Sequence, residues 1–222
     1  MPAVTGCTLT VMPTCFRNPA ISRPDASLPA VSFERFLGAE TFREGVSHYL
    51  SLHAYANTET NDLWDAIETT SGEPVRRLMD SWIWQPGYPL ITASCTSGTG
   101  GTATLHLSQE RFRFTDDAAI GDDSTWVVPI HLRVGSTESV VRLDGDALDV
   151  ALDDPAAPIV VNAGGHGFFR VAYGDDLRQR LTGTTLASLS TLERYSLVDD
   201  AWAATVAGRL SAVEMLDFLE GF

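Results

Sequence analysis

The stretch LMDSWIWQPGYPLI, residues 78–91, changes its character within a few positions. Its first half holds a Leu-Met pair and two tryptophans, which is typical of a helix that packs against other elements. Its second half contains Pro86, Gly87 and Pro89. A helix interior does not tolerate proline, because proline has no backbone N–H and its ring clashes with the preceding turn. The sequence therefore predicts that a helix ends before Pro86 and that a different architecture begins there.

Upstream of this boundary the apolar residues recur at helical spacing. Phe42 and Val46 fall on one face of an amphipathic helix. The next stretch, TETNDLWDAIETTSGEPVRRLMDSW, predicts a helical pair in which Thr60 is the N-cap, Gly72 closes the first helix and Pro74 opens the second. Residues 1–32 contain five prolines and little periodicity, so we expect a flexible leader before the helical segment 33–85.

Downstream the apolar period changes from 3.6 to 2. The clearest alternating strand runs from Trp126 to Val134, and Pro129 within it favours an edge position. Further short strands are expected near 103–108, 139–143, 147–152, 159–162 and 167–173. About seven strands at this spacing predict an antiparallel β-sandwich over residues 86–173.

One parity change interrupts the alternation. Leu105 and Leu107 have one parity, whereas Phe112 and Phe114 have the other. An extra residue absorbed at 109–110 would restore a single apolar face, so the pattern predicts a β-bulge there.

From Gly174 to Phe222 the helical period returns. The sequences STLE at 190–193 and SAVE at 211–214 are capping boxes, and Gly208 stands where the helix between them is expected to stop. We therefore expect two antiparallel helices over 174–222. The fold class predicted for the chain is α+β and multidomain, with a helical segment, an antiparallel sandwich of about seven strands and a helical hairpin.

Composition excludes several classes of function. The net charge is −14, with 29 acidic and 15 basic residues, and every basic residue is arginine. Nucleic acid is excluded as a partner because a phosphate-binding surface needs clustered positive charge. No apolar run reaches the ~20 residues of a membrane span. Three scattered cysteines do not make a disulfide framework, which favours a reducing compartment, the cytoplasm.

The five histidines do not predict a metal site. None is followed by Glu, so the His-Glu-x-x-His signature is absent. His48 and His53 point to different sides of a helix. His106 and His131 lie on predicted strands, where a chance meeting would supply two ligands without a third. His166 lies in a glycine-rich loop that is followed by a strand, which favours a turn over a phosphate cradle.

Other candidate groups also favour structural roles. Cys95 is expected to be a small core residue. Paired aspartates stand at 116–117, 122–123, 153–154 and 199–200, and we interpret them as solvated acids because their spacing matches no calcium loop. We therefore predict no catalytic, cofactor-binding or metal-ligating residue in this chain.

Two motifs together resemble one protein family. The run Trp82, Gln85, Pro86, Gly87, Tyr88, Pro89 and the stretch NAGGHGFFRVAY, residues 162–173, are similar to segments of the zinc aminopeptidases of the aminopeptidase N and puromycin-sensitive type. In that family they belong to the end of a thermolysin-like catalytic domain and to the end of a small β-sandwich. The resemblance implies that 33–85 are the last helices of the catalytic domain, 86–173 the sandwich and 174–222 the start of a C-terminal helical domain. Residues 1–32 do not resemble the helix that the family has at this point.

The departures from the family shape the functional expectation. Family members remove N-terminal residues from peptides with a zinc ion held by His-Glu-x-x-His and a downstream Glu, and with a Gly-Ala-Met-Glu-Asn motif. This chain has neither motif. We expect a non-catalytic portion of such an enzyme, inactive alone and without zinc, whose sandwich braces the two flanking domains and whose tryptophans pack at the boundary. Peptides are expected as substrates of the full-length enzyme only.

Two further expectations concern partners. A free-standing sandwich module that binds a protein or a saccharide is the alternative function, with Trp126, Phe112 and Phe114 as exposed anchors, although their alternation with polar residues favours burial. The apolar faces of the helix at Phe42 and of the helix at 211–222 are expected to lack cover, which favours self-association.

Overall fold

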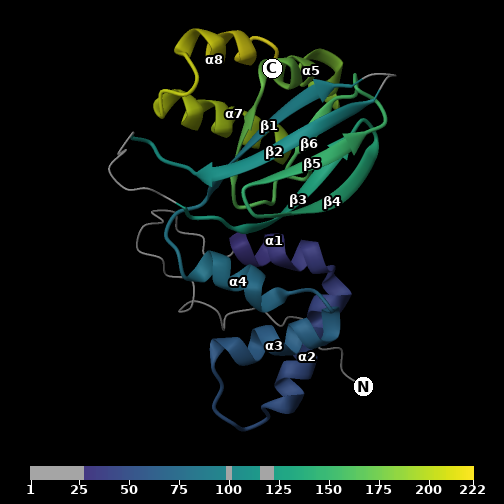
Figure 1. Ribbon diagram of the computed structural model, residues 1–222, viewed down its shortest axis with the longest axis vertical. Helices are drawn as coiled ribbons and strands as arrows, with labels where there is room; N and C mark the ends of the chain where they lie inside the picture. The colour runs from purple at the N-terminus through teal and green to yellow at the C-terminus, as the bar shows by residue number, and fades with distance from the viewer. Residues whose placement is uncertain (1–27, 99–101, 116–122) are drawn as a thin grey trace.

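The computed structural model describes residues 28–98, 102–115 and 123–222, and Figure 1 shows a two-sheet centre with helices at both ends. Helices α1 and α4 lie directly against the sandwich, with α2 and α3 beyond them, and α7 and α8 lie at the opposite end. The helices are α1 (Leu28–Leu37), α2 (Ala39–Leu52), α3 (Thr60–Ser71), α4 (Val75–Ile83), α5 (Asp175–Arg180), α6 (Gly183–Ser188), α7 (Thr191–Val206) and α8 (Ala212–Leu219).

The helical segment begins earlier than its sequence predicts. Helix α1 starts at Leu28, so the last five residues of the expected leader are helical, and residues 1–27 lie outside the described part of the chain. Phe33 is buried against Trp64 and contacts Phe42, which gives the start of this helix an apolar partner. The leader prediction was wrong here because Pro29 is compatible with the first turn of a helix.

The caps of helix α3 explain the following turn. Its N-cap is Glu59, whose backbone N–H donates to the Asp62 carboxylate at 2.8 Å, so the prediction of Thr60 as the cap was wrong by one residue. Gly72 ends the helix with a φ of 71°, as expected for a left-handed C-cap. Pro74 precedes α4 as its N-cap, one residue outside the helix.

Two sheets form the sandwich. One has the order β5-β2-β1-β7 and the other the order β4-β3-β6. The strands are β1 (Pro89–Ser97), β2 (Ala103–Arg111), β3 (Val127–Val134), β4 (Thr137–Asp144), β5 (Ala147–Leu152), β6 (Ile159–Val161) and β7 (Arg170–Tyr173). The prediction of about seven strands is confirmed. All pairs are antiparallel except β1 with β7, which are parallel. The chain leaves β6 in one sheet and crosses to β7 at the edge of the other sheet, where β7 runs in the same direction as β1.

The core lies between the inner faces of the two sheets. Its members alternate along their strands as predicted, and the fully buried ones include Ile91, Leu105, Leu107, Trp126, Ile130, Leu132 and Leu143. Burying one such side chain stabilises the fold by about 1.5–3 kcal/mol.

The expected bulge in β2 is absent. Strands β1 and β2 pair without a break from Ser97↔Ala103 to Pro89↔Arg111. Phe112 has the opposite parity because it lies in a separate apolar cluster with Leu90 and Ala203 of α7. The parity change therefore marks a sheet with apolar residues on both faces, one against the sandwich core and one against a helix.

The edge position predicted from Pro129 is correct only locally. Strand β3 is the central strand of its sheet, but β6 pairs with its last three residues only, Leu132, Arg133 and Val134. Pro129 stands before that stretch, so its missing N–H removes no ladder hydrogen bond to β6. The opposite side of β3 pairs with β4 along its full length.

The C-terminal region contains the two predicted helices and two short ones that the sequence reading missed. Ser190 and Glu193 form the capping box of α7, and Ser211 and Glu214 form that of α8, as expected. Gly208 follows α7 with a φ of 71°. Within the described residues, no helix combines the length and the apolar character needed to cross a bilayer.

Candidate functional site at the junction of the segments

Residues 162–173, here called the junction segment, lie where the sandwich meets the C-terminal helices. It starts with Asn162, which is buried and has a φ of 70°. The side-chain Oδ1 of Asn162 accepts a hydrogen bond from the Gly167 N–H at 2.6 Å, and its carbonyl accepts from the Gly165 N–H at 2.8 Å. Asparagine is among the few side chains that adopt this left-handed conformation readily.

Gly167 is glycine because of a close contact and not because of its backbone conformation. A Cβ at this position would lie 2.2 Å from a ring carbon of Phe169, and 2.8 Å from the Asn162 Oδ1. No side chain fits, so the turn can close on Phe169 only if residue 167 is glycine. The spacing of Asn162 and Gly167 in the motif is thus explained by local geometry.

The next residue joins the junction segment to the stretch that opened the sequence analysis. The Phe168 ring lies 6.2 Å from the Trp82 ring and 5.6 Å from the Tyr88 ring, measured between centroids. Trp82 also lies 6.2 Å from Trp126, and its Nε1 donates to the Val127 carbonyl at 3.0 Å. These aromatic rings, together with one indole hydrogen bond, hold the end of α4 against the sandwich.

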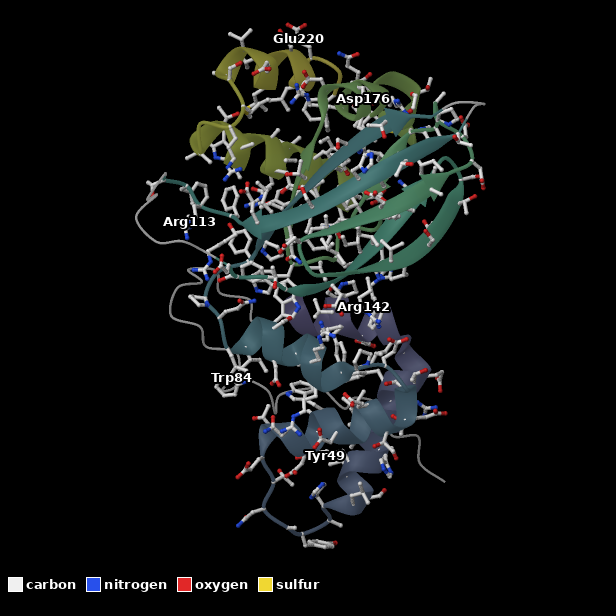
Figure 2. All side chains as sticks on the ribbon, in the orientation of Figure 1. Tyr49, Trp84, Arg113, Arg142, Asp176 and Glu220 are labelled. Carbon is white, nitrogen blue, oxygen red and sulfur yellow. The ribbon has the colours of Figure 1, made fainter. Side chains whose placement is uncertain are left out.

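The second tryptophan of that stretch does not take part. Trp84 is 76% exposed, and its Nε1 donates to the Asp80 carboxylate on its own helix at 3.0 Å. Figure 2 shows Trp84 at the outer edge of the helical end. The prediction that both tryptophans pack at the boundary therefore holds for Trp82 alone.

Arg170 connects the junction segment to helix α7. Its Nη1 donates to Asp200 at 3.1 Å and also contacts the Asp199 carboxylate, and the backbone N–H of Val171 donates to Asp200 at 3.1 Å. Burial raises the pKa of the Asp200 carboxyl to about 7, although the Arg170 charge opposes the rise. The same two carboxylates raise the pKa of Arg170, against the effect of its burial.

The interpretation of Asp199 and Asp200 as solvated acids was wrong. Only 24% and 10% of their side-chain surfaces are exposed. A helical wheel contains a signal for this, because Asp200 lies three residues after Leu197 and seven after Glu193, on the face of α7 that is buried.

Tyr173 ends the junction segment and joins the two sheets. Its hydroxyl donates to the Val161 carbonyl at 3.0 Å and accepts from the Val161 N–H at 2.8 Å, so it satisfies both backbone groups of a β6 residue. Burial raises the pKa of the Tyr173 phenol well above its usual value. The hydroxyl is therefore a neutral structural group throughout the physiological range.

A second ion pair connects the sandwich to the same helix. Glu193 of α7 accepts from Arg133 of β3 at 2.9 Å, from the Gly164 N–H at 2.9 Å and from the Ser190 N–H at 2.8 Å. Burial by itself would raise the pKa of the Glu193 carboxyl, but these donors outweigh it and hold the pKa below its usual value. The single buried carboxylate thus joins β3, the junction segment and the start of α7.

The helical side of the sandwich has its own polar contacts. The Val127 N–H donates to the Ser81 hydroxyl at 3.0 Å, and the Gln85 side-chain amide donates to the Thr125 carbonyl at 2.7 Å. Arg142 pairs with Glu73 at 2.8 Å, and Figure 2 shows Arg142 at the boundary between the sandwich and the helices. This pair is partly exposed and contributes less than the buried bonds.

The histidines are dispersed as the sequence predicts, with one exception. His106 of β2 bridges Thr96 and Asp149 at 2.6 Å each, and it lies in a different sheet from His131 of β3. The charge of His166 is instead one of the causes that lower the pKa of His131, after its burial and the charge of Arg35. Within residues 28–98, 102–115 and 123–222, no three His, Cys, Asp or Glu side chains are grouped so as to hold a metal ion, and we assign no zinc ligand there.

The remaining candidates have structural roles or lie outside the described residues. Cys95 is half-buried against the sandwich core, and Asp153 and Asp154 are exposed. Residues 116, 117 and 122 of the other acidic pairs fall outside the described part of the chain.

The anchors of the alternative function are mostly buried. Trp126 is 1% exposed and Phe112 is 7% exposed. Phe114 is 52% exposed, but its ring packs edge-on against Phe112 at 4.9 Å. These rings therefore do not form the exposed aromatic surface that a free-standing binding module needs.

Comparison with known proteins agrees with this arrangement. Residues 27–82 match the Peptidase family M1 domain, and residues 158–222 match the ERAP1-like C-terminal domain. Aminopeptidase M1 of Arabidopsis thaliana is 33% identical over 207 residues, which cover 85% of this chain and 23% of that protein. Tricorn protease-interacting factor F2 of Thermoplasma volcanium is 35% identical over 189 residues, covering 85% and 22%. Probable aminopeptidase 1 of Saccharolobus solfataricus is 31% identical over 179 residues, covering 81% and 21%.

The chain thus spans less than a quarter of the length of each of these relatives. The first matched region covers the helices before the sandwich, and the second begins at β6 of the sandwich and continues through the junction segment into the C-terminal helices. The chain belongs to peptidase family M1, the aminopeptidase family that its Trp82–Pro89 stretch and its junction segment resemble.

Proposed function

We propose that this chain is a non-catalytic portion of a zinc-dependent aminopeptidase that removes N-terminal residues from peptides. In this proposal residues 28–85 are the last helices of the catalytic domain, 86–173 are the bracing sandwich and 174–222 begin the C-terminal helical domain. The zinc ion and the water it activates belong to a part of the enzyme that these residues do not supply.

The observation that carries the bracing role is a set of three contacts, one on the catalytic-domain side of the sandwich and two on the side of the C-terminal helices. On one side Trp82 donates to Val127. On the other side Glu193 accepts from Arg133, and Asp200 accepts from Arg170. Charge-assisted bonds between buried groups have strict geometry, so they hold the flanking helices in one orientation.

The test of the catalytic part of the proposal is direct. The purified chain is incubated with zinc, its metal content is measured after gel filtration, and hydrolysis of alanyl and leucyl chromogenic substrates is followed. We expect less than stoichiometric zinc and no hydrolysis above a buffer control. Robust hydrolysis that a chelator abolishes would overturn the proposal.

The bracing role has a separate test. Hydrogen exchange is compared between the chain and its Arg170→Met variant. The expected result is faster exchange at the start of α7 and in the junction segment, with little change in α3. Unchanged exchange in α7 would show that the contact does not hold the helix.

We also propose that the isolated chain associates with itself through exposed apolar side chains. At the end of α2, Leu50 and Leu52 are 62% and 61% exposed, and on α8 Val213 and Leu216 are 66% and 62% exposed. Phe42, named in the sequence prediction, packs inward instead. Light scattering across a concentration series checks this, and a strictly monomeric chain at high concentration would contradict it.

We also propose that the protein is located in the cytoplasm. A reducing cytoplasm suits a chain whose described cysteine, Cys95, is free. Localisation of the tagged full-length protein would test it.

A further inference from the structure

A polar cleft of about 270 Å³ lies where α1, β3, β4, the junction segment and α7 meet. A water molecule occupies about 30 Å³ of liquid, so the cleft has room for a small ligand with several waters. Its polar lining residues are Arg35, His131, Arg133, Glu138, Ser139, Ser190 and Glu193. All three segments of the chain therefore contribute side chains to one cleft.

Donor groups in this cleft are not all used by the protein. The Nε2 of His131 and the Nη2 of Arg133 are buried and have no hydrogen-bond partner. A buried polar atom without a partner costs about 1–3 kcal/mol, which a ligand atom that accepts from it would offset. Arginine nitrogens donate only, and an imidazole Nε2 that carries a hydrogen also donates, so an acceptor group satisfies both.

One positive charge of the cleft, that of Arg35, is not paired within the described part of the chain. Arg35 has no carboxylate partner among the described residues, and its guanidinium lies 3.4 Å from where a Cβ of Gly164 would stand. Burial lowers the pKa of His131 and of His166, and the Arg35 charge lowers both further. The unpaired Arg35 guanidinium is therefore close enough to act on both histidines.

The two acids of the cleft both pair with Arg133 and not with Arg35. Glu193 is fully engaged by Arg133 and two backbone N–H groups. Glu138 stands at the rim, 3.6 Å from Arg133, with 69% of its side chain exposed. Neither carboxylate satisfies the His131 Nε2 or the Arg133 Nη2.

We propose that this cleft binds a small oxyanion, a carboxylate or an inorganic phosphate, through Arg35, His131 and Arg133. A planar or tetrahedral oxyanion accepts from guanidinium and imidazole donors at once. Because Arg35 comes from the region that matches the peptidase domain and Arg133 from the sandwich, the bound anion stabilises their contact.

The proposal includes a pH dependence. His131 faces Arg35 of α1, Glu138 of β4 and His166 of the junction segment, and Glu193 of α7 lines the same cleft. An anion among these groups favours the protonated imidazole. Binding of acetate therefore strengthens as the pH falls toward the lowered pKa of His131. Acetate held by arginine alone would show no such trend until acetate itself is protonated.

Calorimetric titration of the chain tests the proposal, with sodium phosphate, sodium acetate and sodium chloride at matched ionic strength. We expect saturable binding of phosphate, acetate or both, and none of chloride. Phosphate alone would identify free phosphate as the ligand class, and acetate would identify a carboxylate. Binding of neither, or equal binding of chloride, would overturn the proposal.

Variants locate the site. Arg35→Gln removes one donor and is expected to weaken binding roughly tenfold, the loss typical of one charge-assisted hydrogen bond. Arg43→Gln is the matched control, because it removes the same charge from an exposed position on α2. Equal affinities of the two variants would refute the site. The His131 imidazole resonance in the unaltered chain provides a second readout, and it must shift on adding the anion that binds.

Discussion

Glu193 offers the sharpest test of how the sandwich holds the C-terminal helices. Its side chain is 2% exposed and accepts from Arg133, Gly164 and Ser190. In Glu193→Ala the Arg133 charge loses its buried partner, and breaking such a pair costs about 3–5 kcal/mol. The two backbone donors, each worth about 1–3 kcal/mol when left buried without a partner, overlap with that cost. We therefore expect the free energy of unfolding to fall by about 4 kcal/mol.

The chain contains a matched control. Glu214 occupies the same position in the capping box of α8, where its carboxylate accepts from the Ser211 N–H at 2.9 Å, but it is exposed and forms no salt bridge with the described residues. Urea unfolding is followed by circular dichroism for both alanine variants. With a slope of roughly 2 kcal/mol per molar, Glu193→Ala moves the midpoint by about 2 M, and Glu214→Ala moves it far less. Equal shifts would show that Glu193 acts only as a helix cap.

The same carboxylate predicts a pH dependence. Because the folded pKa of Glu193 lies below the usual glutamate value of 4.5, its contribution is fully present above pH 4.5 and is lost as the pH falls through the folded pKa. Glu193→Gln removes this titration, so its stability changes less steeply than that of the unaltered chain below pH 4.5. Asp200 titrates in both proteins, so its contribution, which is lost as the pH rises from its unfolded pKa through about 7, cancels in the comparison. Identical acid limbs for the two proteins would refute the assignment.

Four further substitutions test individual contacts. Tyr173→Phe leaves the backbone N–H and carbonyl of Val161 without their partner, so chemical unfolding should show a loss of about 1–3 kcal/mol, and an unchanged midpoint would contradict the bridging role. Trp82→Phe should lower the free energy of unfolding by about 1–2 kcal/mol, whereas Trp84→Phe should change it by less than about 0.5 kcal/mol. Gly167→Ala places a methyl 2.2 Å from a ring carbon two residues later, and thermal unfolding should show a loss of about 1–3 kcal/mol or more.

Local signals in the sequence predicted the elements well. The two capping boxes, the glycine at the end of α3 and the alternation in β3 depend on residues only a few positions apart. The interactions that define them are contained within one turn or one strand. The boundary at Pro86 belongs to the same class, because proline acts on its own backbone and on the turn before it.

Contacts between distant residues were predicted poorly, and the two clearest errors have one cause. Phe112 was assigned to the sandwich core through a bulge, and Asp200 was assigned to solvent. Helix α7 explains both, because it covers the outer face of the four-stranded sheet near Phe112 and buries Asp200 against Arg170. A period of two or of 3.6 identifies which residues share a face, but it does not identify what covers that face.

In the candidate site, the motif is recognisable in the sequence but the partners of its side chains are not. The junction segment resembles a family motif from Asn162 to Tyr173, yet the partners of its side chains lie elsewhere: Asp200 for Arg170, Trp82 for Phe168 and Val161 for Tyr173. The motif residues therefore share no single chemistry, since one forms an ion pair, one an aromatic contact and one a bridge between sheets. What they share is a boundary, because each contact joins the junction segment to a different neighbour. Three such contacts constrain three positions of one short segment, so the motif has a physical basis in the packing of the junction segment.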